Sequence, residues 1–75
     1  MQRITKASKA NLMAADRLEL VKAAEGGWIL RMWRGAEYTF AYGAEDTLNW
    51  QSVQDGRRFC RRFRPGLEPT SFVSQ

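Results

Sequence analysis

Histidine is missing from this 75-residue chain, and cysteine occurs only once. Without histidine, neither a Ser-His-Asp nor a Cys-His catalytic arrangement can form within one chain. One cysteine and no histidine leave too few soft ligands for a structural zinc site, and a lone cysteine forms no internal disulfide. We therefore expect no zinc centre and no triad-type hydrolase, and a reducing, cytoplasmic setting is the simplest interpretation.

Long apolar runs and phosphate-binding motifs are also lacking. No run approaches the roughly 18 apolar residues that a membrane span needs, and the first ten residues, MQRITKASKA, lack the apolar region of a secretory signal. Neither G-x-x-x-x-G-K-[ST] nor G-x-G-x-x-G occurs. Glu45 and Asp46 could act as acids or bases, but they stand where we expect a helix to begin, and capping is the commoner role there. We predict a non-enzymatic protein with no catalytic residues, no metal, no cofactor and no membrane contact.

Bulky apolar residues, by contrast, are plentiful. Hydrophobic residues make up 44% of the chain, and three Trp, four Phe and two Tyr provide material for a core. This content is too high for a disordered chain, and no linker divides the sequence. We expect one small domain over residues 1–75, with residues 1–16 as an N-terminal arm or helix and residues 67–75 as a loose C-terminal tail.

Residues 17–42 show the pattern of an antiparallel meander. GWILRMW is rich in aromatic and aliphatic residues, and EYTFAY places aromatic residues at period two. Gly-Gly at 26–27 and RGAE at 34–37 mark turns, so we predict strands over residues 17–23, 28–33 and 38–42. The first strand competes with a helix, because ANLMAADRLELVKAAEGG also aligns apolar residues on one helical face. We favour a short helix or arm before Asp16, followed by a strand.

Residues 47–63 predict a helix, with Asp46 as its cap and Pro65-Gly66 at its end. An Asp55-Gly56 hairpin turn is the competing interpretation, but the helical stripe accounts for more residues. Small residues in the stripe would let the helix approach the sheet closely. The predicted fold is thus α+β, a three-stranded antiparallel meander packed by one C-terminal helix. The stripe consists of Leu48, Ser52, Val53, Gly56, Phe59, Cys60 and Phe63.

Residues 57–64 hold five of the twelve basic residues and no acid. The rest of the chain has seven basic and eight acidic residues, so the net charge of +4 is concentrated on one surface. Helical geometry places Arg57, Arg61 and Arg64 opposite the apolar stripe, beside an exposed Trp50 and Gln54. Arginine offers a planar fork for phosphate, and both Arg and Trp stack on bases. The predicted binding residues on this helix are Arg57, Arg58, Arg61, Arg62, Arg64 and Trp50.

Three roles are open for this surface. It can bind the nucleic-acid backbone, which is the role that we favour. It can face an acidic surface on a protein partner, as an inhibitor or adaptor would, for example a phage or mobile-element protein of the anti-CRISPR type that acts on host machinery. It can also simply keep an aromatic-rich protein soluble.

Trp28 and Trp33 have opposite parity within one strand, so their side chains should point to opposite faces of the sheet. One should lie in the core, while Trp33, with Arg31 on its side, could belong to a second binding surface. A terminal arm or a second subunit could instead cover it, and a homodimer through the open sheet face is an alternative. Cys60 lies on the apolar stripe, where we expect a buried structural thiol.

Residues 17–63 resemble the KTSC domain, a small family of poorly defined function. Gly35, Tyr38 and Phe40 give G-x-x-Y-x-F where that family has G-x-x-Y-x-Y, and Gly56 and Phe59 give its later G-x-x-F, followed by basic residues. The Val-Pro that usually follows the aromatic pair is replaced here by AYGAED. The resemblance implies a compact domain sometimes linked to nucleic-acid-associated proteins, and it transfers no catalytic residues.

Overall fold

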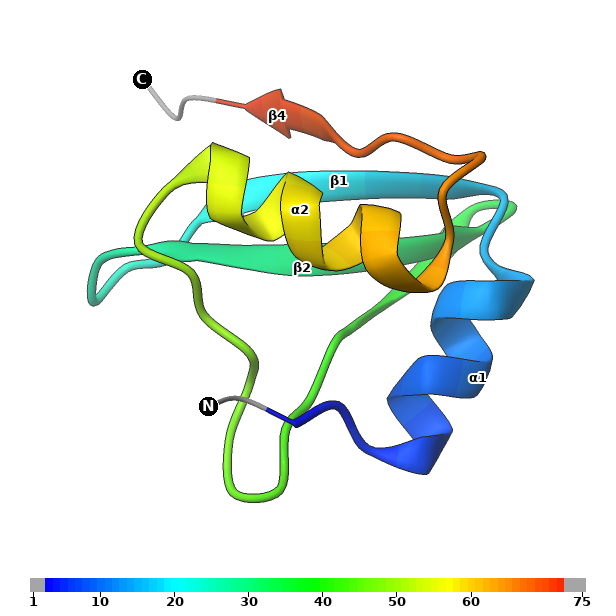
Figure 1. The fold of residues 1–75 in the computed structure, drawn as a ribbon, viewed down its shortest axis with the longest axis horizontal. Helices are drawn as coiled ribbons and strands as arrows, with labels where there is room; N and C mark the ends of the chain where they lie inside the picture. Colours follow the sequence, from blue (N-terminus) through cyan, green and yellow to red (C-terminus); the bar gives the residue numbers. More distant parts are fainter. Residues whose placement is uncertain (1–2, 73–75) are drawn as a thin grey trace.

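Four strands and two helices follow one another in residues 3–72, the part of the chain that the computed structural model describes. The strands form one mixed sheet in the order β3-β2-β1-β4, in which β4 alone is parallel to its neighbour β1. Figure 1 shows α2 lying across one face of this sheet, with α1 beside it. The elements are α1 (Lys6–Ala14), β1 (Arg17–Lys22), β2 (Trp28–Arg34), β3 (Glu37–Phe40), α2 (Val53–Phe63) and β4 (Thr70–Phe72).

The predicted α+β class, the three-strand meander and the helix before Asp16 are confirmed. Thr5 caps α1, because its side chain accepts a hydrogen bond from the Ser8 backbone N–H at 3.2 Å. The turn between β1 and β2 contains Gly27, whose φ of +79° is a conformation that side chains rarely adopt. Asp16 holds the next turn, since its carboxylate accepts from the backbone N–H of Gly35 at 2.8 Å.

The start of the second helix differs from the prediction. The helix begins at Val53, and its cap is Ser52, whose hydroxyl accepts from the Asp55 backbone N–H at 3.2 Å. The preceding segment is extended because Trp50 exchanges two backbone hydrogen bonds with Trp28, at 2.7 and 2.9 Å. Asp46 caps no helix; its carboxylate accepts from the adjacent Thr47 N–H. The predicted helix over residues 47–52 is therefore wrong, and so is the competing hairpin at residues 55–56.

Gly56 lets α2 pack closely on the sheet, as the small residue in the apolar stripe predicted. A Cβ atom at this position would lie 2.9 and 3.0 Å from the two Cδ atoms of Leu20 on β1. Glycine inside a helix costs about 1 kcal/mol relative to alanine. The close contact explains why the position tolerates that cost.

The C-terminal segment contributes a strand where a loose tail was expected. Glu19, Leu20 and Val21 of β1 pair with residues 70–72, so the sheet has four strands and the predicted count of three is wrong. A three-residue strand carries too little periodicity to be recognised in the sequence. Residues 73–75 of the predicted tail lie outside the described part of the chain.

Both helices cover the same face of the sheet. Leu12 of α1 and Cys60 of α2 meet side chains from β1 and β2 in the core. Within residues 3–72, no helix is long and apolar enough to cross a membrane. The fully buried large side chains are Leu12, Leu18, Leu20, Leu30, Met32 and Cys60.

Candidate functional site

Helix α2 has one side packed against the sheet and one side exposed to solvent. Gly56 and Cys60 are buried against the sheet, and the residues opposite them are exposed. Arg57 precedes Cys60 by three residues and Arg64 follows it by four, so both lie on the flank of the buried stripe and are only half exposed. The predicted grouping of Arg57, Arg61 and Arg64 on the outermost face is therefore wrong. The outer face of α2 consists of Gln54, Arg58, Arg61 and Arg62.

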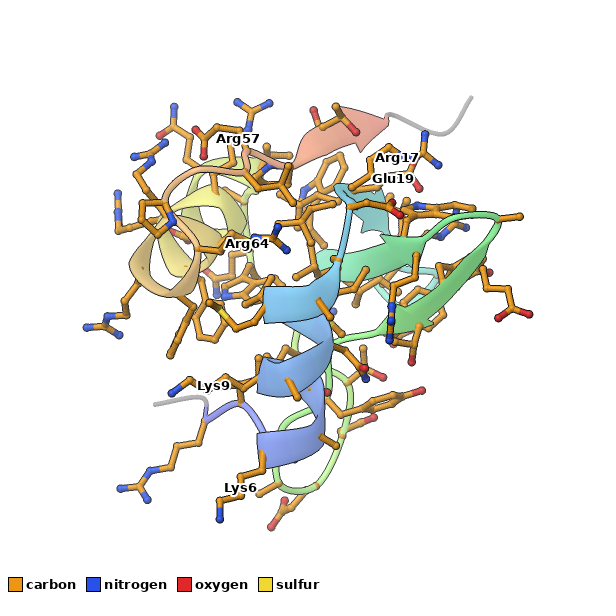
Figure 2. All side chains as sticks on the ribbon, turned by 90° about the vertical axis from the view of Figure 1, so that its right-hand side faces the viewer. Lys6, Lys9, Arg17, Glu19, Arg57 and Arg64 are labelled. Atoms are coloured by element: carbon orange, nitrogen blue, oxygen red, sulfur yellow. The ribbon has the colours of Figure 1, made fainter. Side chains whose placement is uncertain are left out.

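Arg64 joins the two helices. Its Nη1 donates to the carbonyl oxygen of Leu12 at 2.8 Å and also to that of Ala15, where α1 ends. Figure 2 shows Arg64 directed towards α1. The last carbonyls of a helix have no partner within it, and the guanidinium satisfies two such groups while placing positive charge at the negative end of the helix dipole. Arg64 thus fixes α1 in place and does not lie on the outer face.

Two of the other arginines have acidic neighbours, and both pairs are exposed. Arg58 Nη1 lies 3.5 Å from Asp55 Oδ1, and Arg61 Nη2 lies 3.0 Å from Glu68 Oε1. The side chains of Arg58 and Arg61 are 77% and 57% exposed, so water screens these pairs and each contributes little to stability. Arg57 and Arg62 form no ion pair within residues 3–72. The positive charge of the outer face is therefore available to an anion at small cost.

Two hollows lie on this side of the molecule, and Arg58 belongs to both. The first, of about 300 Å³, is lined by one amide and three guanidinium groups, those of Gln54, Arg57, Arg58 and Arg61. We call it the arginine hollow. The second, of about 290 Å³, has two aromatic rings as well as charged groups. We call it the aromatic hollow, and it is lined by Trp50, Asp55, Arg58, Phe59 and Arg62.

Trp50 is in the core, not on the outer face where it was predicted. It is 7% exposed, because it precedes the helix and its backbone pairs with Trp28. Its ring packs against Phe59, with centroids 5.1 Å apart, and Phe59 packs against Phe63 at 4.9 Å. The Lys9 ammonium of α1 lies 5.6 Å from the Phe63 ring. An aromatic row of Trp50, Phe59 and Phe63 thus borders the arginines and ends at a lysine.

Lys9 and Lys6 are two basic residues that the sequence prediction missed. Figure 2 shows both on α1, with Lys9 pointing to the same side of the molecule as α2. Their spacing of three residues places them on one helical face, which is the signal that could have identified them. Lys9 extends the positive surface beyond residues 57–64, because its ammonium lies near Phe63 of α2.

Trp33 lies on the opposite side of the sheet. As predicted, Trp28 and Trp33 point to opposite faces, and Figure 2 shows Arg17 and Glu19 on the side of the sheet away from α2. Alternation along the strands places Trp33 with these two residues on this open face, whereas Arg57 and Arg64 lie on the helical side. The structure therefore does not bring Trp33 together with the arginines of α2. The open face comprises Arg17, Glu19, Arg31, Trp33, Tyr38 and Phe40.

Glu19 connects two residues of the open face, a role that no sequence pattern indicated. It is only 5% exposed, and its Oε1 accepts from Trp33 Nε1 and Arg31 Nη1, each at 3.2 Å. The Arg17 guanidinium lies 4.5 Å from the Trp33 ring, and Tyr38 lies 4.8 Å from it on the neighbouring strand. The ring of Trp33 is thus already in contact with an arginine and a tyrosine of the same protein.

Cys60 is fully buried, as expected for a structural thiol. Desolvation, and secondarily the nearby negative charge of Glu68, raise the pKa of Cys60 to about 12. A thiol with that pKa is protonated at neutral pH and is a poor nucleophile. Among the described residues, no group of three or more His, Cys, Asp or Glu side chains could hold a metal ion.

Comparisons of this chain with protein-family models, with curated proteins and with solved structures found no match. The resemblance to the KTSC domain therefore stays a hypothesis that rests on the short motifs of residues 35–40 and 56–59.

Proposed function

We propose that this protein is a non-enzymatic module that binds nucleic acid through the outer face of α2 and the adjoining arginine hollow. The observation that carries the proposal is the concentration of four arginines there, with two of them free of ion pairs in residues 3–72. A guanidinium binds phosphate oxygens through two parallel hydrogen bonds. The proposed contacts are Arg57, Arg58, Arg61 and Arg62, with Lys9 at the edge of the surface.

Phosphate contacts predict weak sequence preference and a steep dependence on salt. Each phosphate that is neutralised releases counterions, so the logarithm of affinity falls with the logarithm of salt by roughly 0.7–0.9 per contact. Contacts of this kind position a nucleic acid but do not read its sequence. Arg64 and Trp33 have no place in this contact set, because one holds α1 and the other lies on the far side of the sheet.

Fluorescence anisotropy with labelled oligonucleotides at two salt concentrations tests the proposal. The triple variant Arg58→Ala, Arg61→Ala, Arg62→Ala should bind at least about tenfold more weakly, and its salt slope should fall by roughly 2–3. Two single variants that remove the same charge make the test more specific. Arg62→Ala should weaken binding several-fold. Arg34→Ala, at an exposed position on β2, should not. Unchanged binding by the triple variant would contradict the proposal.

An acidic protein surface is the second candidate partner. Arg58 and Arg61 already pair with carboxylates of the same chain, so the outer face accepts carboxylate groups as well as phosphates. Competition between an oligonucleotide and polyglutamate of equal charge distinguishes the two candidates. Displacement of the oligonucleotide by less than an equal concentration of polyglutamate would favour the protein partner.

A further inference from the structure

The arginine hollow and the aromatic hollow differ in the charge of their linings. Only basic and amide side chains line the first, whereas the carboxylate of Asp55 lines the second. A phosphate is attracted to the first and repelled by the carboxylate in the second. The two hollows therefore suit different chemical groups, although Arg58 forms part of both.

The aromatic hollow has the features of a site for an unpaired base. The rings of Trp50 and Phe59 supply an apolar floor, and the guanidinium groups of Arg58 and Arg62 can stack on a base from the rim. Asp55 supplies an acceptor for a base amino group, as acidic side chains do for cytosine. The volume of about 290 Å³ lies just below the roughly 300–1,000 Å³ range of small-ligand pockets, which suits a group as small as one base.

The shared wall at Arg58 places a phosphate site beside a base site, and a nucleotide carries these two groups joined by one sugar. We infer that α2 binds single-stranded nucleic acid, with a phosphate in the arginine hollow and the adjoining base in the aromatic hollow. A duplex cannot occupy both hollows, because its bases are paired and stacked inside the helix while its phosphates lie outside. The inference rests on the proposed function and specifies the class of nucleic acid.

The open face of the sheet is less suited than the aromatic hollow to stacking with a nucleic-acid base. The arginines of this face lie on the rings themselves: Trp33 and Tyr38 contact each other, and Arg17 and Arg31 lie over them respectively, with guanidinium–centroid distances of 4.5 and 4.7 Å. A base would have to displace these arginines. On α2, the arginines border a hollow, with Arg58 and Arg62 beside the ring of Phe59.

Three probes of equal length separate the base site from the phosphate site: a single strand, its duplex, and an abasic single strand that keeps the phosphates and sugars. The single strand should bind about fivefold or more tightly than the abasic strand, which is the low end of what one stacked base contributes. It should also bind more tightly than the duplex. Equal affinity for all three, lost together in the triple arginine variant, would overturn this inference and leave the proposed function standing. No binding of any probe would overturn both.

Phe59→Leu removes a ring from the aromatic hollow while keeping an apolar side chain in the aromatic row. Its affinity for the single strand should fall about fivefold, and its affinity for the abasic strand should stay the same. Phe63→Leu is the matched control, because Phe63 belongs to the same row but does not line the hollow. Thermal unfolding checks that both variants are folded at the assay temperature. Equal loss for both probes in Phe59→Leu would contradict a base contact.

Asp55→Ala gives a test in which two effects have opposite signs. Removing a negative charge should strengthen binding of the abasic strand by up to about twofold, since Asp55 repels phosphates. Binding of oligo-dC should instead weaken about threefold, because the acceptor for the cytosine amino group is lost. An equal gain for both probes would show that Asp55 makes no base contact and would overturn that part of the inference.

Discussion

Two regions of this small domain contain arginine beside aromatic rings, the outer face of α2 with its aromatic hollow and the open face of the sheet, but they differ in what the arginines do. On the open face, Arg31 pairs with the buried Glu19 and Arg17 lies on the ring of Trp33. On α2, Arg58 and Arg61 form exposed pairs and Arg62 forms none in residues 3–72. The arginines of the open face are thus engaged with partners in their own sheet, whereas those of α2 remain available to an anion.

Arg64 provides the strongest test of this distinction, because it belongs to the basic segment yet behaves like the arginines of the open face. Arg64→Ala should lower the free energy of unfolding by about 2–3 kcal/mol, since two carbonyls at the end of α1 lose a charged donor. Arg62→Ala should change it by less than about 0.5 kcal/mol. Urea unfolding measures both. Similar free energies of unfolding for the two variants would contradict a structural role of Arg64 that Arg62 lacks.

Glu19 tests whether the contacts of the open face stabilise the fold. Glu19→Gln should destabilise the protein by about 1–2 kcal/mol, which is less than a fully buried pair would lose, because Arg31 is 32% exposed and water can solvate it. Glu37→Gln, at an exposed position on β3, is the control and should be nearly neutral. Neither variant should alter oligonucleotide affinity by more than about twofold, since both residues lie away from α2. A larger change would mean that the open face contributes to binding.

Cys60 lies on the buried side of α2, and its burial makes the stability of the protein depend on pH. Its pKa rises from 9.0 to about 12 in the folded protein, so folding favours the protonated thiol. The resulting stability is fully present below pH 9 and is lost as the pH rises from 9 towards 12, by at most about 1.4 kcal/mol per pH unit. Urea unfolding between pH 8 and 10.5 should therefore show a steeper decline for the native protein than for Cys60→Ala. Parallel declines would contradict burial of the thiol.

Local patterns were enough to predict the meander, the helix over residues 53–63 and the burial of Cys60, because each depends on side-chain periodicity. Two of the errors involve partners distant in sequence. Trp50 is extended because it pairs with Trp28, and Arg64 reaches carbonyls 49 and 52 residues earlier in the chain. Side-chain spacing within a helix carries no information about such contacts.

The smallest expected effect is that of Arg17→Ala on oligonucleotide affinity. It tests whether binding depends on total charge or on arginines that an anion can reach. Arg17→Ala and Arg62→Ala each remove one positive charge, but Arg17 lies on the ring of Trp33 on the face away from α2. Arg17→Ala should therefore change single-strand affinity by less than about twofold, whereas Arg62→Ala should reduce it several-fold and lower the salt slope by roughly 0.7. Anisotropy at two salt concentrations measures both quantities. If the two variants lost affinity equally, net charge alone would account for binding, and the outer face of α2 would have no special role.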